Sequence, residues 1–298
     1  MDEIMKLDNI SQYNALRGIE TLHPLVSVFD FANMKLIPQA MANYGFYCVF
    51  LKDAVCGDLK YGCNYYDYQE GTLVFIAPGQ VVGIGSKPGT TMPKGWGLLF
   101  HPDLIRGTSL GHNIKQYTFF TYEAREALHL SEKERQVVLD CMDKIDYELR
   151  QSIDKHSKTL ITNNIELLLN YCMRFYDRQF ITRSEVNRDI LAKFEKLIDN
   201  YFQSEIALTA GLPTVKFCAE QLFLSPNYFG DLIKKETGKS AQENIQLKVM
   251  GIAKERIFDK SKTMSEIAYE LGFKHPQHFS RMFKNETGFT PNEYRLLN

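Results

Sequence analysis

Four polar residues near the end of the chain have the types and the spacing needed to read DNA. They lie at positions i, i+3, i+4 and i+7, which fall on one face of a helix: Gln277, Ser280, Arg281 and Lys284. Glutamine and arginine can hydrogen-bond to the edges of adenine and guanine in the major groove, and serine is a flexible partner. The lysine suits phosphate groups. This helix face is therefore a candidate for contacts with duplex DNA.

A second stripe with the same spacing lies fifty residues earlier and has weaker chemistry. Its members are Asn227, Gly230, Asp231 and Lys234. Glycine lowers the stability of a helix by about 1 kcal/mol relative to alanine. Aspartate can accept a hydrogen bond from cytosine but is repelled by phosphates. We therefore expect base contacts to depend more on the later stripe than on this one.

Both stripes belong to a sequence repeat. Residues 225–240 read SPNYFGDLIKKETGKS, and residues 275–290 read HPQHFSRMFKNETGFT. A shorter helical segment precedes each copy, TVKFCAEQLFL from Thr214 and TMSEIAYELGF from Thr263. Helix, tight turn and second helix, repeated once, is the layout of a DNA reader with two helix-turn-helix units. An ordinary solvated face would explain one such stripe, but the duplication in register favours DNA reading.

The ends of the repeated helices are marked by residues that start and stop helices. Ser225 and His275 are polar N-cap candidates, and each is followed by proline at the first helical position. Gly238 and Gly288 can adopt the positive φ of a C-terminal cap. Three further helix starts carry a capping box: Ser240 with Glu243, Thr263 with Glu266, and Thr290 with Glu293.

Residues 188–298 resemble the DNA-binding domain of the AraC/XylS family of transcription regulators. The more specific match is the second copy, IAYELGF followed by HFSRMFKNETGFTPNEYR. The resemblance implies two helix-turn-helix units, at about 214–238 and 263–288, whose reading helices enter successive major grooves on one face of DNA. The joining helix runs from Ser240 to about Asp259, with an apolar stripe at Ile245, Val249, Ile252, Ala253 and Ile257.

The same resemblance implies partners and a mechanism. The partners are double-stranded promoter DNA and RNA polymerase, and the chain is expected to form a homodimer. A small-molecule effector bound by the N-terminal half would change how the reading units are presented to the promoter, and activation of transcription would follow. An N-terminal half that only contacts proteins is the alternative to an effector.

Residues 24–122 contain short apolar runs separated by Gly, Pro, Asn and Asp. The runs are LVSVFDF, YGFYCVFL, GTLVFIAPGQVVGIG and WGLLF, and they predict many short strands in a barrel or sandwich. A small barrel can enclose one ligand. Aromatic residues are dense in this region: Tyr44, Phe46, Tyr47, Tyr61, Tyr65, Tyr66, Tyr68 and Phe75. A plain aromatic core without a ligand is the alternative.

The segment Glu70-Gly71-x-Leu73-x-x-x-x-Pro78-Gly79 resembles the strand-turn pattern of cupins, which many AraC-type regulators carry in the N-terminal arm. Metal-binding cupins have two His, a Glu and a further His in this region. Only the Glu is kept here, because the four ligand positions fall on Cys63, Tyr65, Glu70 and Val82. We therefore expect no metal, no cofactor and no catalytic residues. A cupin-type enzyme or ligand-binding protein with an attached DNA-binding module is the alternative.

The expected fold class is multidomain α+β. Residues 1–182 would form a cupin-like β-barrel at about 24–122, with helices following at about 131–178. Residues 188–298 would form an all-α domain with the two helix-turn-helix units. At 298 residues the chain can form two domains with cores of their own.

Two helices are predicted between the barrel and the DNA reader. The first begins at a capping box of Ser131 and Glu134, and the second runs from about Thr159 to Arg178. The second has a heptad stripe: Ile161, Ile165, Leu168, Cys172 and Phe175. This stripe predicts a dimer seam, although packing against the chain's own barrel would produce the same pattern. Residues 181–189, ITRSEVNRD, are predicted to be a polar linker, and Ile190 to Phe202 a further helix.

Charge and composition narrow the class of protein. Residues 211–298 hold 13 Lys and Arg against 10 Asp and Glu, a net charge of +3, and the rest holds 22 against 26, a net charge of −4. A weakly basic DNA reader must depend on local contacts more than on a broad field. The six cysteines lack zinc spacing, which favours reduced thiols in the cytosol. The start, MDEIMKLDNI, lacks a signal-peptide core, and no apolar run is long enough for a membrane span, so a cytoplasmic location is expected.

Overall fold

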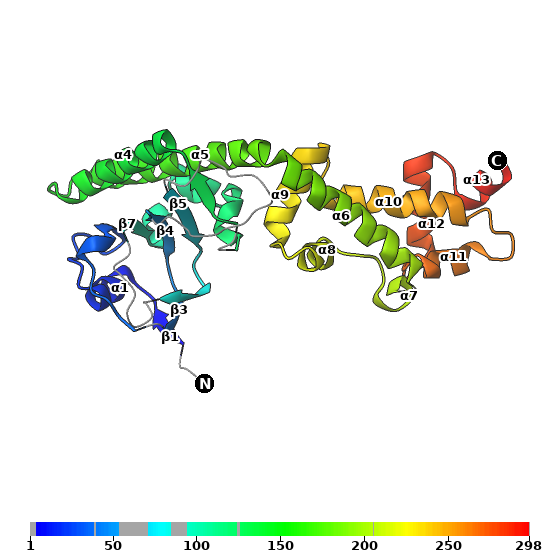
Figure 1. Ribbon diagram of the computed structural model, residues 1–298, viewed down its shortest axis with the longest axis horizontal. Coiled ribbons are helices and arrows are strands. Elements are labelled where there is room, and N and C mark those ends of the chain that lie inside the picture. Colours follow the sequence, from blue (N-terminus) through cyan, green and yellow to red (C-terminus); the bar gives the residue numbers. More distant parts are fainter. Residues whose placement is uncertain are drawn as a thin grey trace. The chain divides into compact units, whose positions relative to one another are not determined.

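The strands predicted between residues 24 and 122 form in the computed structural model of the chain (Figure 1). Four of them coincide with the apolar runs of the sequence: β2 (Val26–Asp30), β4 (Tyr47–Lys52), β5 (Gly71–Ile76) and β7 (Gly95–Phe100). With β8 (Leu128–Leu130) they build one antiparallel sheet in the order β2-β7-β4-β5-β8. Val49 at its centre pairs with Phe75 on one side and with Leu98 on the other.

The structure describes residues 4–38, 40–53, 71–84, 94–123, 126–204 and 206–297. The chain divides into two compact units, Met1–Thr182 and Arg183–Asn298. The first unit combines β-sheets with helices, and the second is helical in its described part. Four of the aromatic residues noted in this region, Tyr61, Tyr65, Tyr66 and Tyr68, lie outside the described residues, as do the cupin positions Cys63 and Glu70.

A smaller sheet lies beside the large one and does not close it into a barrel. It consists of β1 (Met5–Leu7), β3 (Ala40–Tyr44) and β6 (Val81–Ile84), in the order β1-β3-β6. In the described residues the backbone groups of β3 are paired with β1 and β6, and no ladder joins this sheet to the five-stranded one. The expected closed barrel is therefore replaced by two separate sheets in this part of the chain.

A helix that the sequence analysis did not predict, α1 (Ile10–Arg17), packs with the small sheet. Asn9 starts it with a capping box, and Gly18 ends it in the left-handed conformation at a φ of 69°. Tyr13 of this helix contacts Tyr44 and Phe46, with ring centroids 6.3 and 6.2 Å apart. Together with side chains of β2, β4, β5 and β7 they form one buried hydrophobic cluster on this side of the large sheet.

Two long helices, α4 (Glu132–Leu149) and α5 (Ser157–Thr182), cover the opposite side of the large sheet (Figure 1). The capping box predicted for Ser131 and Glu134 starts α4. Two short helices, α2 (Pro102–Ile105) and α3 (Ser109–Asn113), pack on α5 and were not expected from the sequence. Phe119 joins helix to sheet, because its ring stacks on Tyr176 of α5 and lies 4.3 Å from Phe75 of β5.

The predicted dimer seam on α5 is wrong. Its five members are at most 6% exposed within the single chain: Ile161, Ile165, Leu168, Cys172 and Phe175. They are covered by the chain's own first unit, in which α4 and β8 pack on α5. A heptad stripe marks a helix face that must be buried, and here the same chain covers it.

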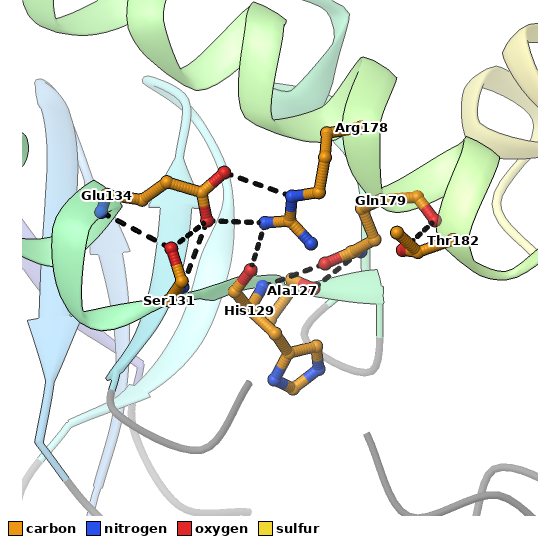
Figure 2. Close-up of polar contacts among 7 residues, drawn as sticks. All are labelled: Ala127, His129, Ser131, Glu134, Arg178, Gln179 and Thr182. Carbon is orange, nitrogen blue, oxygen red and sulfur yellow. Dashed lines mark hydrogen bonds and ion pairs between the residues drawn. The ribbon is translucent and has the colours of Figure 1, made fainter. Parts of the chain in front are cut away.

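Polar contacts fasten the last turn of α5 to the edge of the large sheet (Figure 2). Arg178 donates to both carboxylate oxygens of Glu134, at 3.0 and 2.7 Å, and to the carbonyl oxygen of His129 at 2.7 Å. The buried amide of Gln179 accepts from the backbone N–H of His129 at 2.8 Å and donates to the carbonyl of Ala127 at 3.2 Å. The side-chain amide of Gln179 therefore provides hydrogen-bond partners for two backbone groups at the edge strand β8, as a neighbouring strand would.

The predicted polar linker is also wrong, because almost all of it is helical. Helix α5 continues to Thr182, and α6 (Ser184–Gln203) begins two residues later. The amphipathic pattern of α6 therefore starts six residues before the predicted Ile190. Asn187 lies inside the former linker, is buried, and donates to Glu236 at 3.0 Å. A short helix, α7 (Ile206–Ala210), follows.

Candidate nucleic-acid interface

Two helix pairs form at the repeated segments. The first is α8 (Val215–Gln221) with α9 (Pro226–Thr237), and the second is α11 (Met264–Glu270) with α12 (Pro276–Thr287). Both second helices have proline at their first position and end at a left-handed glycine, Gly238 or Gly288. Ser225 caps α9 by accepting from the backbone of Tyr228, whereas the side chain of His275 makes no capping bond.

The two pairs repeat in three dimensions as well as in sequence. The hydroxyl of Thr237 donates to the carbonyl of Ile233 at 2.8 Å, and that of Thr287 donates to the carbonyl of Phe283 at 2.8 Å. In α9 the buried side includes Phe229, Leu232 and Ile233, as predicted. In α12 it includes Phe279 and Phe283. The two helices therefore share their local hydrogen bonds and their buried apolar positions.

Helix α10 (Ala241–Arg256) connects the two pairs and carries the predicted apolar stripe. Four stripe residues are buried and Ile252 is half-buried: Ile245, Val249, Ala253 and Ile257. All three capping boxes predicted in this unit form, at Ser240, Thr263 and Thr290. Hydrogen bonds from these residues lower the pKa of the partner glutamates: Glu243, Glu266 and Glu293.

The eight candidate DNA contacts divide by exposure. On α12, Gln277, Arg281 and Lys284 are exposed and Ser280 is half-buried. On α9, Asn227 and Lys234 are exposed, whereas Gly230 and Asp231 are half-buried. Each stripe lies on the side of its helix away from the buried phenylalanines.

The α12 face has cations that remain available for a ligand. In the described part of the chain, neither Arg281 nor Lys284 has a carboxylate within ion-pair distance. Other cations of this unit are used inside it, as with Lys248, which bonds Asp199 at 3.0 Å, and Lys262, which bonds Glu270 at 2.6 Å. Free cations on an exposed helix face are the groups that DNA phosphates and guanine edges can use.

A depression of about 370 Å³ lies beside Arg281, between α10 and α12. Its lining includes residues that the stripe analysis did not single out: Gln246 and Met250 of α10, and His278, Met282, Asn285 and Glu286 of α12. His278 and Asn285 lie three residues before and four after Arg281, so helical spacing could have identified them. The two α10 residues had no such signal, because only tertiary packing brings α10 to α12.

The reading helices are supported by side chains of neighbouring elements. Phe194 of α6 packs edge-on against Phe229 of α9, with ring centroids 5.2 Å apart. Arg256 at the end of α10 donates to the carbonyl of Phe202 at 2.7 Å. Arg295 of α13 (Pro291–Leu297) donates to three carbonyls of the segment that follows α10: Ile257, Asp259 and Lys262. These bonds link α10 to α6 and α13 to the segment after α10 within the second unit.

The turns of the two helix pairs differ in whether one equivalent position requires glycine. In the second pair the turn contains Gly272, with a φ of 86°, and a Cβ there would lie 2.5 Å from the carbonyl carbon of Gly211. The equivalent residue of the first pair is Phe223, which has a φ of 57° and is 74% exposed. A non-glycine residue in this conformation costs about 1–2 kcal/mol. The second turn requires glycine because the backbone of another segment packs against it. In the first turn the equivalent residue is exposed to solvent.

Two further findings concern other kinds of site. Within the described ranges no group of three or more His, Cys, Asp and Glu is placed to hold a metal ion. Among the same residues, no helix is long and apolar enough to cross a membrane.

Comparisons with known proteins match the second unit. A helix-turn-helix domain family matches residues 218–296. The uncharacterized transcriptional regulatory protein YesN of Bacillus subtilis is 40% identical over 78 residues, which are 26% of this chain and 21% of that protein. The uncharacterized regulator YobQ of the same organism is 34% identical over 82 residues, 28% of this chain and 34% of that protein. The C-terminal domain of AraT, a response regulator from Geobacillus stearothermophilus, has 28% identity and a TM-score of 0.33, covering 37% of this chain and 85% of that one.

The sequence matches concern the helix-turn-helix domain in the second unit. Residues 218–296 match a helix-turn-helix domain family, and the relatives that share this segment are named as regulators of transcription. Both curated relatives are named as regulators of transcription, and neither is named as an enzyme. The chain spans about a fifth of the length of YesN and about a third of that of YobQ, so the similarity concerns the helix-turn-helix domain.

Proposed function

We propose that the chain is a cytoplasmic, sequence-specific regulator of transcription. In this proposal α9 and α12 enter successive major grooves of promoter DNA, and the α12 face supplies most of the base recognition. The observation that carries the proposal is the exposed stripe of Gln277, Arg281 and Lys284, which lies on a duplicated and braced helix pair. The weaker α9 stripe, with Gly230 and Asp231, would contribute mainly through its ends, Asn227 and Lys234.

The finer parts of the function rest on the family resemblance. They are activation through RNA polymerase, control by a small molecule bound to a cupin-like N-terminal unit, and homodimerisation. A homodimer would use a surface other than the buried α5 stripe. The domain limits proposed are 1–182 for the sensing part and 188–298 for the DNA-binding part.

Arg281 is the residue whose substitution tests base recognition. The full chain would first select its preferred duplex from a randomised library at low salt, and affinities would then be measured by fluorescence anisotropy. We expect Arg281→Ala to cost about 1–3 kcal/mol on the selected duplex and to relax the preference at one base pair. Arg281→Lys keeps the charge but loses the planar fork, so it should lose most of the same preference.

Lys284→Ala is the matched variant for a phosphate contact. It should weaken binding to all duplexes by a similar factor and leave the base preference unchanged. Equal losses on every sequence for Arg281→Ala and Lys284→Ala would show that Arg281 contacts only phosphate. A folded chain that binds no duplex at low salt would contradict the proposed function as a whole.

A further inference from the structure

The depression beside Arg281 is surrounded by polar side chains that the chain itself does not use. Gln246 of α10 and His278, Asn285 and Glu286 of α12 line it together with Arg281. In the part of the chain that the structure describes, none of these side chains makes a hydrogen bond or an ion pair. Unused donors from two helices that meet at one depression indicate a binding site.

The equivalent side of the first reading helix is covered by the chain itself. Glu236, which matches Glu286 in the repeat, accepts a hydrogen bond from Asn187 of α6 at 3.0 Å. Leu232, which matches Met282, is fully buried, whereas Met282 is half-buried. The repeat therefore places the same helix side against a partner in the first pair and leaves it open in the second. The open side is available to a ligand.

The place of the depression on α12 indicates what that ligand is. An α-helix with its side chains is about 10–12 Å across, and the major groove is about 12 Å wide, so a helix in the groove fills it. If the α12 stripe meets the base edges, the side chains beside the stripe meet the sugar–phosphate backbone. Arg281 belongs both to the stripe and to the depression, so the depression adjoins the proposed DNA face.

The chemistry of the lining fits a phosphate and its sugar. The side-chain amides of Gln246 and Asn285 can donate to phosphate oxygens, which accept most of the hydrogen bonds that proteins give to DNA. The apolar part of the lining consists of Met250 and Met282, whose flexible thioethers suit contact with a deoxyribose. The one acid of the lining, Glu286, is repelled by a phosphate. Glu286 therefore weakens the contact that the amides make.

We propose that the depression holds one sugar–phosphate unit of the DNA backbone, with Gln246 and Asn285 as the donors to its phosphate. The site deepens the DNA binding proposed above and rests on it. Because both amides are uncharged, they position the strand without taking the place of a counterion. A strand fixed beside Arg281 would set the base pair that this side chain meets.

Alanine substitutions of the two amides test the site on the selected duplex. Gln246→Ala and Asn285→Ala should each weaken binding to every duplex by about three- to tenfold, because each removes one hydrogen bond. The dependence of affinity on salt should keep its steepness, whereas Lys284→Ala should reduce it by about one unit. Thermal melting of each variant without DNA should match that of the unmodified chain. Unchanged affinity in both variants would overturn the proposal.

Replacing single phosphates identifies the one that occupies the depression, whatever the stability of the variants. A methylphosphonate removes the charge and one acceptor oxygen, and it would be placed at successive positions of the selected duplex. At one position the unmodified chain should lose about tenfold in affinity, and the double variant Gln246→Ala/Asn285→Ala at most about twofold, because its contact is already absent. Losses that are the same in both chains at every position would overturn the proposal.

Glu286→Gln tests the acid of the depression in the opposite direction. The variant removes the repulsion of the phosphate, so binding to all duplexes should become about three- to tenfold tighter at low salt. Glu255→Gln is the matched control, because Glu255 is exposed on α10 outside the lining. The control should change affinity by less than the test variant. Equal gains in the two variants would reveal a general effect of charge and contradict a phosphate in the depression.

The same measurements separate this site from the proposed function. Loss of affinity in Arg281→Ala and Lys284→Ala without any loss in Gln246→Ala or Asn285→Ala would keep the regulator and overturn the backbone site. The depression would then be assigned to a protein partner instead of DNA. A folded chain that binds no duplex at low salt would overturn the regulator and the backbone site together.

Discussion

Single residues distinguish the two reading helices, and Gly230 is the clearest case. A Cβ at Gly230 would meet no atom within 4 Å, and the same holds for Gly251 in the middle of α10. Both positions have ordinary helical backbone, so neither needs glycine for its conformation. The glycine in α10 has no evident role, whereas the one in α9 lies on the candidate DNA face.

Alanine substitutions at these two positions separate stability from DNA contact. Gly230→Ala and Gly251→Ala should each raise the free energy of unfolding by about 0.5–1 kcal/mol, because alanine favours the helix. Urea denaturation would measure this. We expect Gly251→Ala to keep its DNA affinity and Gly230→Ala to lose some, since glycine lets the backbone approach DNA closely. Unchanged affinity in Gly230→Ala would argue against close contact by α9.

At the scale of elements, α5 is held by packing along its length. Leu168 is fully buried and its neighbour Leu167 is 40% exposed, so the two form a matched pair. Leu168→Glu should cost at least about 3 kcal/mol, because a charge is buried without a partner. Leu167→Glu should stay within about 0.5 kcal/mol of the unmodified chain. Circular dichroism during thermal melting measures both, and a folded, monomeric Leu168→Glu chain would restore the dimer seam.

The end of α5 depends on polar contacts as well (Figure 2). Gln179→Ala should lower the free energy of unfolding by about 2 kcal/mol or more, because it removes the buried amide that bonds the N–H of His129 and the carbonyl of Ala127. Gln136→Ala is the control, since Gln136 is an exposed glutamine of α4 that bonds its helix neighbour Asp140. Similar losses of unfolding free energy in both variants would show that the buried amide stabilises the sheet edge no more than an exposed glutamine stabilises its helix.

For the whole molecule, the uneven charge predicts how DNA binding responds to salt. Residues 211–298 carry a net charge of +3 in a chain whose total is −1. We expect the logarithm of the affinity to fall linearly with the logarithm of salt concentration, because phosphate contacts release counterions. Lys284→Ala should reduce the steepness by about one unit, whereas Gly251→Ala should leave it unchanged. Affinity that is independent of salt would contradict phosphate contacts on α12.

Local sequence signals determined the limits of the helices in the second unit. Each of these signals acts on backbone groups only a few residues away in the sequence. They are the capping boxes at Ser240 and Thr263 and the glycines that end α9 and α12. Because these hydrogen bonds and backbone conformations need no distant partner, the sequence alone predicts where the helices begin and end. The repeat made the polar stripes identifiable for the same reason, because spacing along one helix decides which side chains share a face.

Tertiary structure decided what the apolar stripe of α5 faces and how the strands associate. Leu168 would satisfy a partner chain or its own sheet equally well, and only the packing of α4 and β8 settled the matter. The linker prediction failed for a similar reason, since Asn187 is polar in sequence but is buried and donates a hydrogen bond to Glu236. The depression beside Arg281 is formed by α10 and α12, which are separated in the chain. A sequence pattern indicates that a side chain must be buried or paired. The tertiary structure determines which residues bury it or pair with it.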